Sequence, residues 1–107
     1  MFNVKLFDSE AFCGYKQITT FYMDFGIAEP FGEQAIRDTY TRGLEYAKTD
    51  YKALTELVMV LNWKIWEHYQ TNERLARVYN DLWEQSDIFA TEYLKGDELA
   101  YFYRTTD

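Results

Sequence analysis

The stretch YKALTELVMVLNWKIWEHY, residues 51–69, decides the fold class of this chain. Its apolar residues recur at spacings of three and four, which is the period of one face of an α-helix. Met59, Val60, Trp63 and Trp66 widen the apolar arc until only a narrow polar strip remains. A helix that is apolar on most of its sides packs against several neighbours. We therefore expect a central helix over residues 51–69 with other helices around it.

Cap residues on both sides of this stretch predict where helices begin. Asp50 and Asn72 are good N-cap residues, because a short polar side chain can accept a hydrogen bond from the first helical turn. Asn72 opens a predicted helix over residues 73–95, with a buried stripe of Leu75, Val78, Tyr79, Leu82, Phe89 and Tyr93. Only two or three residues join this helix to the central one, so we expect the pair to be antiparallel.

The rest of the chain divides at Pro30 and Gly96. Proline interrupts a helix, so residues 17–28 and 33–48 are predicted as separate helices. Gly96 suits the left-handed position that follows a helix end, and a short last helix is predicted after it. For residues 1–16 the sequence pattern fits three structures: a short strand, a docked extended arm or a short helix. We expect one all-α domain over residues 1–107, with four or five helices, because this length leaves no room for a second core.

Few side chains in this sequence are typical of catalysis or metal binding. Cys13 is the only cysteine, which excludes an intramolecular disulfide, and one cysteine with one histidine does not supply a zinc site. His68, the only histidine, lies on the apolar stripe of the central helix, where a hydrogen-bonded core residue is commoner than a catalyst. The sequence has neither a phosphate-binding glycine loop nor a serine nucleophile elbow. We expect a protein that is not an enzyme and takes no metal or cofactor.

Negative charge is concentrated towards the C-terminus. Residues 81–107 hold seven acids and two bases, so they contribute -5 to a formal net charge of -7. Direct binding to nucleic acid needs clustered Lys and Arg and is not expected. An acidic surface fits a protein partner with a basic surface, such as a nucleic-acid-binding enzyme. The candidate contact residues are Asp81, Glu84, Asp87, Glu92, Asp97 and Glu98.

Three other interpretations stay open for the function. The acidic residues are more commonly those of a solvated surface that keeps a protein soluble. A ligand-binding bundle or small enzyme would have its site near Trp63, Trp66, His68 and Tyr69, because bundle interiors can hold ligands. A structural homodimer would bury one face of the central helix against a second copy.

The sequence shows no membrane segment. The longest unbroken apolar run, residues 57–61, is far too short to cross a bilayer. The N-terminus lacks a cationic start followed by an apolar run, which is the pattern of a signal peptide. We therefore expect a cytoplasmic protein.

Three stretches carry a resemblance to a known group of proteins: TFYMDFGIA (20–28), LTELVMVLNWKIWEHY (54–69) and LKGDELAYFYRTTD (94–107). Together they resemble a family of small uncharacterised helical proteins encoded on plasmids, phages and integrative elements of gut Gram-positive bacteria. The resemblance covers most of the chain from about residue 19 onward. It implies an accessory gene of mobile DNA, and hence an inhibitor of a host nucleic-acid-handling defence system, such as a restriction or CRISPR effector, as one form of the interaction protein. No functional residue is carried over from the family.

Overall fold

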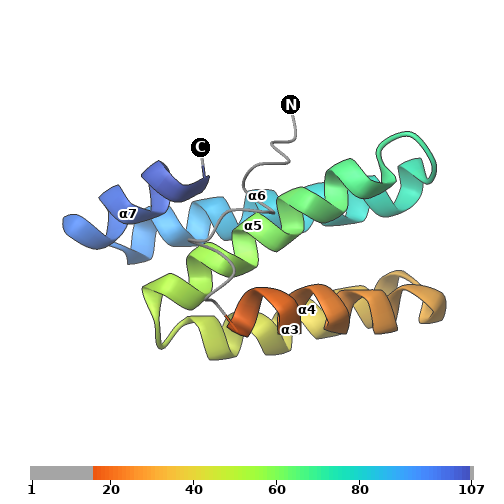
Figure 1. The fold of residues 1–107 in the computed structure, drawn as a ribbon, viewed down its shortest axis with the longest axis horizontal. Helices are drawn as coiled ribbons and strands as arrows, with labels where there is room; N and C mark the ends of the chain where they lie inside the picture. The colour runs from red at the N-terminus through yellow and green to blue at the C-terminus, as the bar shows by residue number, and fades with distance from the viewer. Residues whose placement is uncertain (1–15, 107) are drawn as a thin grey trace.

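A computed structural model describes residues 16–106, which form five α-helices and one short 3-10 helix without a strand (Figure 1). The elements are α3 (Lys16–Ala28), η1 (Glu29–Phe31), α4 (Glu33–Ala47), α5 (Tyr51–His68), α6 (Glu73–Tyr93) and α7 (Asp97–Thr106). This confirms the predicted all-α class. Cys13 and the strand or arm predicted for residues 1–16 lie outside the described residues, except that Lys16 begins α3.

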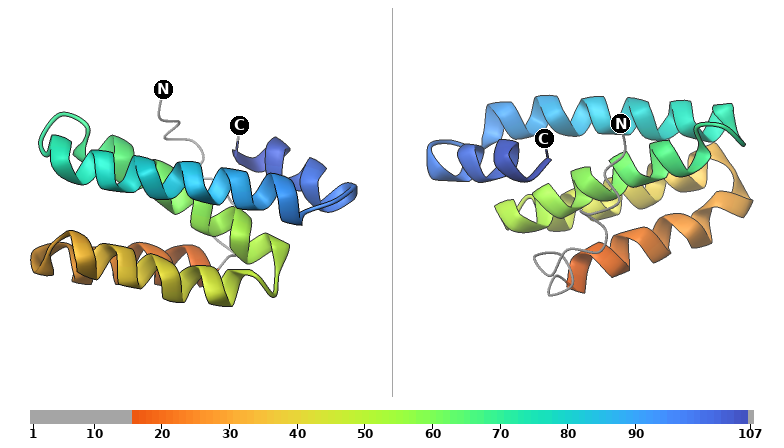
Figure 2. Two further views of the ribbon diagram at one scale, coloured as in Figure 1. Left: turned by 180° about the vertical axis from the view of Figure 1, so that it is seen from behind. Right: turned by 45° about the horizontal axis from the view of Figure 1, so that its top comes forward.

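The central helix predicted from the sequence is α5, which packs against α3, α4, α6 and α7. The α3 and α4 pair lies on one side of α5, and α6 with α7 lies on the other (Figure 2). α6 returns along α5 in the opposite direction, as the short connection predicted, and this is the most extensive helix pair of the fold.

The helix boundaries follow from local side-chain chemistry. The carboxylate of Asp50 accepts a hydrogen bond from the amide of Lys52 at 2.9 Å, and the side-chain oxygen of Asn72 accepts one from the amide of Leu75 at 3.2 Å. Both residues are therefore the N-caps that the sequence predicted. Gly96 has a φ of 58°, so the left-handed residue that separates α6 from α7 is confirmed as well.

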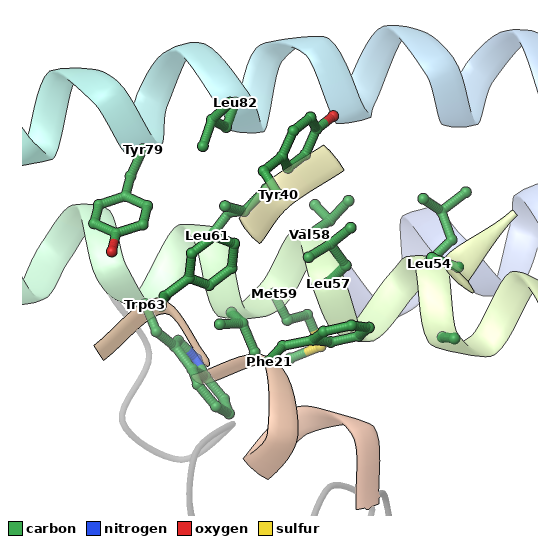
Figure 3. Close-up of a cluster of buried hydrophobic side chains, with 14 of the residues drawn as sticks. Phe21, Tyr40, Leu54, Leu57, Val58, Met59, Leu61, Trp63, Tyr79 and Leu82 are labelled. Carbon is green, nitrogen blue, oxygen red and sulfur yellow. The ribbon is translucent and has the colours of Figure 1, made fainter. Parts of the chain in front are cut away.

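The core lies where the two layers meet α5. Figure 3 shows Phe21 from α3, Tyr40 from α4, and Tyr79 and Leu82 from α6 gathered around the α5 residues. Every residue from Ala53 to Leu61 is buried, so α5 is covered by its own chain on all sides over this length. Burial of this much apolar surface is the main source of stability in such a fold.

Two details of the predicted helices are wrong. The helix over 73–95 ends at Tyr93, because Leu94 is extended with a ψ of 144°. Tyr93 was placed in the buried stripe but is 51% exposed; its ring stacks on Phe89, and its hydroxyl donates to the carbonyl of Lys48 at 2.6 Å. Within residues 16–106, none of the helices has the length and apolar character needed to cross a membrane.

Candidate functional site

The outer side of α6 carries an exposed strip, here called the acidic α6 face: Asp81, Glu84, Ile88 and Glu92. These residues follow one another at spacings of three and four, so the helical repeat places them in one row. Ile88 is 58% exposed, and the two glutamates lie one helical turn before and after it. In the described part of the chain, neither glutamate forms an ion pair with a base. The structure thus places two of the six predicted contact residues, Glu84 and Glu92, on either side of an exposed aliphatic side chain, with Asp81 at the end of the same row.

The remaining acidic candidates have more local roles. Asp81 lies at one end of the face, where its carboxylate is 3.5 Å from the guanidinium of Arg37 on α4. Asp87 is half-buried and lies about 100° around the helix from Ile88, outside the row of the acidic α6 face. Asp97 and Glu98 occupy the first turn of α7, where carboxylates stabilise the positive end of the helix dipole. Their charge is therefore explained by helix stability alone.

A second polar group surrounds His68, in the interior of the fold. This Lys64 cluster consists of Tyr22, Glu29, Lys64, Glu67, His68 and Tyr79, drawn from α3, η1, α5 and α6. The ammonium of Lys64 is 2.8 Å from Oε2 of Glu29 and 2.7 Å from Oε2 of Glu67. Only 2% of the Lys64 side chain is exposed. A buried charge is tolerated when it is paired and hydrogen-bonded in this way.

Glu29 is the hub of this cluster. Its Oε2 accepts a hydrogen bond from the hydroxyl of Tyr79 at 2.6 Å and lies 3.0 Å from Nε2 of His68, in addition to the contact with Lys64. The imidazole stacks on the ring of Tyr79, with ring centres 5.8 Å apart. His68 is therefore the hydrogen-bonded residue of the interior that the sequence predicted.

The pKa values in the Lys64 cluster follow from these contacts. Burial tends to raise the pKa of Glu29 and of Glu67, but hydrogen bonds from Lys64 and the tyrosines outweigh it and hold both below the ordinary value. Burial, the hydrogen bond to Glu67 and the nearby negative charges raise the pKa of Tyr22 to about 12. The pKa of Tyr79 is raised further by burial and by Glu29. Both carboxyls are therefore charged, and both phenols neutral, at pH 7.

Glu29, Glu67 and His68 also offer the geometry of a metal site, since one donor atom from each lies within 4.8 Å of the others. The ammonium of Lys64 contacts the same two carboxylate oxygens that an ion would use. A divalent ion would have to displace it and leave a buried lysine without a counter-ion, at a cost of several kcal/mol. The geometry therefore favours a structural cluster, in which Lys64 pairs with both carboxylates, that fastens η1 to α5 and α6.

Another buried acid stands apart from this cluster. Glu56 on α5 is 2% exposed, and in the described part of the chain it forms no ion pair. Desolvation, with a smaller contribution from the negative charge of Asp50, raises the pKa of Glu56 to about 7. This carboxyl is a source of pH-dependent stability rather than part of a site.

The tryptophans divide between the core and the surface. Trp63 is buried, and with the half-buried Trp83 it lines one small hollow between α5 and α6, as expected for core packing. Trp66 is on the surface, tilted against the ring of the exposed Tyr69. Trp66 is thus the one tryptophan with an exposed side chain, and Trp63 and Trp66 do not form one binding surface.

Comparison with protein-family models, with curated proteins and with solved structures gave no match. The resemblance to proteins of mobile elements therefore stays a prediction.

Sequence reasoning missed the Lys64 cluster because its members come from four separate elements. Lys64 and Glu67 belong to the narrow polar strip of the central helix, and Glu29 precedes Pro30 in the break between two predicted helices. The one local signal was the spacing of Lys64, Glu67 and His68 at i, i+3 and i+4, which places the three side chains on one side of α5.

Proposed function

We propose that this protein is a non-enzymatic binding module that presents the acidic α6 face to a partner protein with a basic surface. The observation that carries the proposal is the exposure of Ile88 between Glu84 and Glu92. An aliphatic side chain at the centre of a contact excludes water, and flanking carboxylates then interact more strongly with Lys or Arg of the partner. The carboxylates alone are equally compatible with a solvated surface, so Ile88 is the distinguishing feature.

The charge of the surroundings supports a basic partner. Lys95 and Arg104 are the only bases in residues 81–107, against seven acids. Long-range attraction of this kind raises association rates and weakens as salt is added. We therefore expect a partner that binds tightly at low ionic strength and is released at high ionic strength.

A more specific form of the proposal is an inhibitor of a nucleic-acid-handling enzyme of a host defence system. From Asp81 to Glu92 the acidic α6 face extends about 16 Å along the helix axis. Carboxylates in such a row can occupy a basic groove in place of phosphates, because both present oxygen acceptors with negative charge to Lys and Arg. This form also depends on the resemblance to proteins of mobile DNA.

The other interpretations have less support. The homodimer was suggested by the apolar character of the central helix, but α5 is already buried within one chain from Ala53 to Leu61. A ligand or catalytic site near His68 would need polar groups free to bind a substrate. Instead, Lys64 and His68 both contact the carboxylate of Glu29.

The proposal is tested by affinity capture with tagged protein from a bacterial lysate, at low and at high salt. Three forms are compared: the unchanged chain, Ile88→Ala, and the double variant Glu84→Gln/Glu92→Gln. The matched controls are Ile27→Ala, an isoleucine of 65% exposure on α3, and Asp38→Asn/Glu45→Gln, which removes two exposed charges from α4. Circular dichroism checks that each variant folds.

We expect capture of a basic protein that is lost at high salt and reduced at least about tenfold by the two α6 variants. The two controls should capture it as the unchanged chain does. Equal capture by all five proteins would place the contact elsewhere, and the absence of a salt-sensitive basic partner would overturn the proposal.

A further inference from the structure

A separate hollow of about 280 Å³ opens between α3 and α4, on the side of α5 opposite to α6. Ligand pockets in proteins usually have volumes of about 300–1,000 Å³, so this one fits only a small molecule. Its wall on α3 includes Phe21 and Asp24, and its wall on α4 includes Arg42, Gly43 and Tyr46. The hollow is distinct from the acidic α6 face and from the Lys64 cluster.

Gly43 lies at the apolar end of the hollow. A Cβ at this position would lie 3.4 Å from the ring of Phe21 and 3.6 Å from Leu57, which is ordinary contact, so the absence of a side chain leaves room beside these two residues. Phe21 and Tyr46 meet edge to face beside it, with ring centres 6.4 Å apart. Tyr46 is 50% exposed and Phe21 only 6%, so the ring of Tyr46 supplies most of the surface against which an aromatic or aliphatic group can pack.

Two opposite charges border this apolar surface. Asp24 comes from α3 and Arg42 from α4, and in the described part of the chain each lacks a charged partner, including the other. The guanidinium of Arg42 is held by a hydrogen bond of 3.1 Å to the hydroxyl of Thr39, another lining residue. A guanidinium fixed in this way has donors left for a carboxylate, which is its preferred partner.

From this arrangement we infer that the hollow is a binding site for a small zwitterion with an apolar body, of the type of a free hydrophobic amino acid. The ligand's carboxylate pairs with Arg42, its ammonium pairs with Asp24, and its side chain packs against Phe21 and Tyr46. Asp24 and Arg42 are both exposed, so neither needs a partner, but a zwitterion can form an ion pair with each of them whereas a ligand with a single charge can form only one. A ligand of this size is expected to bind with a Kd of about 1 mM.

The test is a titration of the ¹⁵N-labelled protein with L-phenylalanine, followed by the amide signals of residues 42 and 43 in NMR spectra. Two matched probes each lack one charge: phenethylamine has no carboxylate, and 3-phenylpropionate has no ammonium. Two variants remove the protein charges singly, Arg42→Gln and Asp24→Asn. Arg74→Gln, at an exposed arginine of α6 without an ion pair in the described residues, is the control.

We expect saturable shifts at residues 42 and 43 with L-phenylalanine, about two- to fivefold weaker binding of both single-charge probes, and a similar loss in both variants, because both protein charges are exposed. The control variant should bind as the unchanged protein does. The inference is overturned if L-phenylalanine gives no saturable shift up to about 20 mM, which is well above the expected Kd. It is equally overturned if either single-charge probe binds as tightly, or if either variant leaves the affinity unchanged.

Discussion

Replacing Lys64 by Met tests the buried charge cluster directly. The substitution keeps the length and the apolar stem of the side chain but removes the ammonium between Glu29 and Glu67. Two carboxylates then face each other without a counter-ion, in a place where only one of them reaches water easily. Breaking a buried ion pair by removing one partner costs about 3–5 kcal/mol. Because Glu67 is about one-third exposed and can turn to solvent, we expect a loss of about 2–4 kcal/mol in the free energy of unfolding.

The assay is urea denaturation followed by helical circular dichroism at pH 7, since two-state unfolding is typical of a domain of this size. Lys52→Met on the same helix is the matched control, because Lys52 is exposed and forms no ion pair in the described residues. It should change stability by less than about 0.5 kcal/mol. Adding Glu29→Gln to Lys64→Met should restore part of the loss, since an amide needs no counter-ion. If Lys64→Met costs less than about 1 kcal/mol, the cluster does not fasten η1 to α5 as described.

Three further predictions concern pH and helix caps. The pKa values of Glu29 and Glu67 are lowered in the fold, so their contribution to stability is present above their ordinary pKa of 4.5 and is lost as the pH falls below it. Glu29→Gln should therefore reduce the loss of stability at acidic pH, measured by denaturation at a series of pH values from 3 to 6. The effect of pH through Glu56 is the opposite, because the pKa of Glu56 is raised from 4.5 to about 7 in the fold. The free energy of unfolding should therefore fall as the pH rises through this range, by at most about 3 kcal/mol. Glu56→Gln should remove this pH dependence in denaturation measurements from pH 5 to 8. Asn72→Ala should cost about 1 kcal/mol by urea denaturation because it removes the cap of α6, whereas Asn80→Ala on the exposed side of α6 should cost clearly less; equal losses would contradict the capping role.

The positions of the helices in the sequence and the antiparallel α5–α6 pair were predictable because they depend on local patterns. The three-and-four spacing of apolar residues located α5, and short polar side chains at Asp50 and Asn72 located where helices begin. The short link between α5 and α6 then left only an antiparallel pair. These signals lie within a few residues of one another, so they need no knowledge of the rest of the fold.

The buried charges were not predictable in the same way. Lys64 and Glu56 look like ordinary members of an exposed strip, and the charge of Glu29 acquires a partner only when η1 packs against α5. Tyr93 is the reverse case. Its position matches the apolar stripe of α6, yet it lies in the last turn, where the ring moves out to stack on Phe89. Its hydroxyl donates to the carbonyl of Lys48 at the end of α4, so this error too depends on a contact between segments far apart in the sequence.

The acidic α6 face was predicted only in part. The six acids were identified by charge, but charge alone could not separate those that support a helix start, Asp97 and Glu98, from those that surround Ile88. The exposure of Ile88 depends on which side of α6 faces α5. The helical repeat therefore defined the row of acids, whereas the packing of α6 showed where the row carries an apolar centre.

The most direct test of the central claim is to map where the captured basic partner touches this protein. The amide signals of the ¹⁵N-labelled chain would be recorded with increasing amounts of the partner, at low and at high salt. The account predicts shifts or broadening concentrated on residues 81–92 of α6, strongest near Ile88, and largely reversed at high salt. Shifts confined to α3, η1 or α4, or a pattern on α6 that is insensitive to salt, would contradict it.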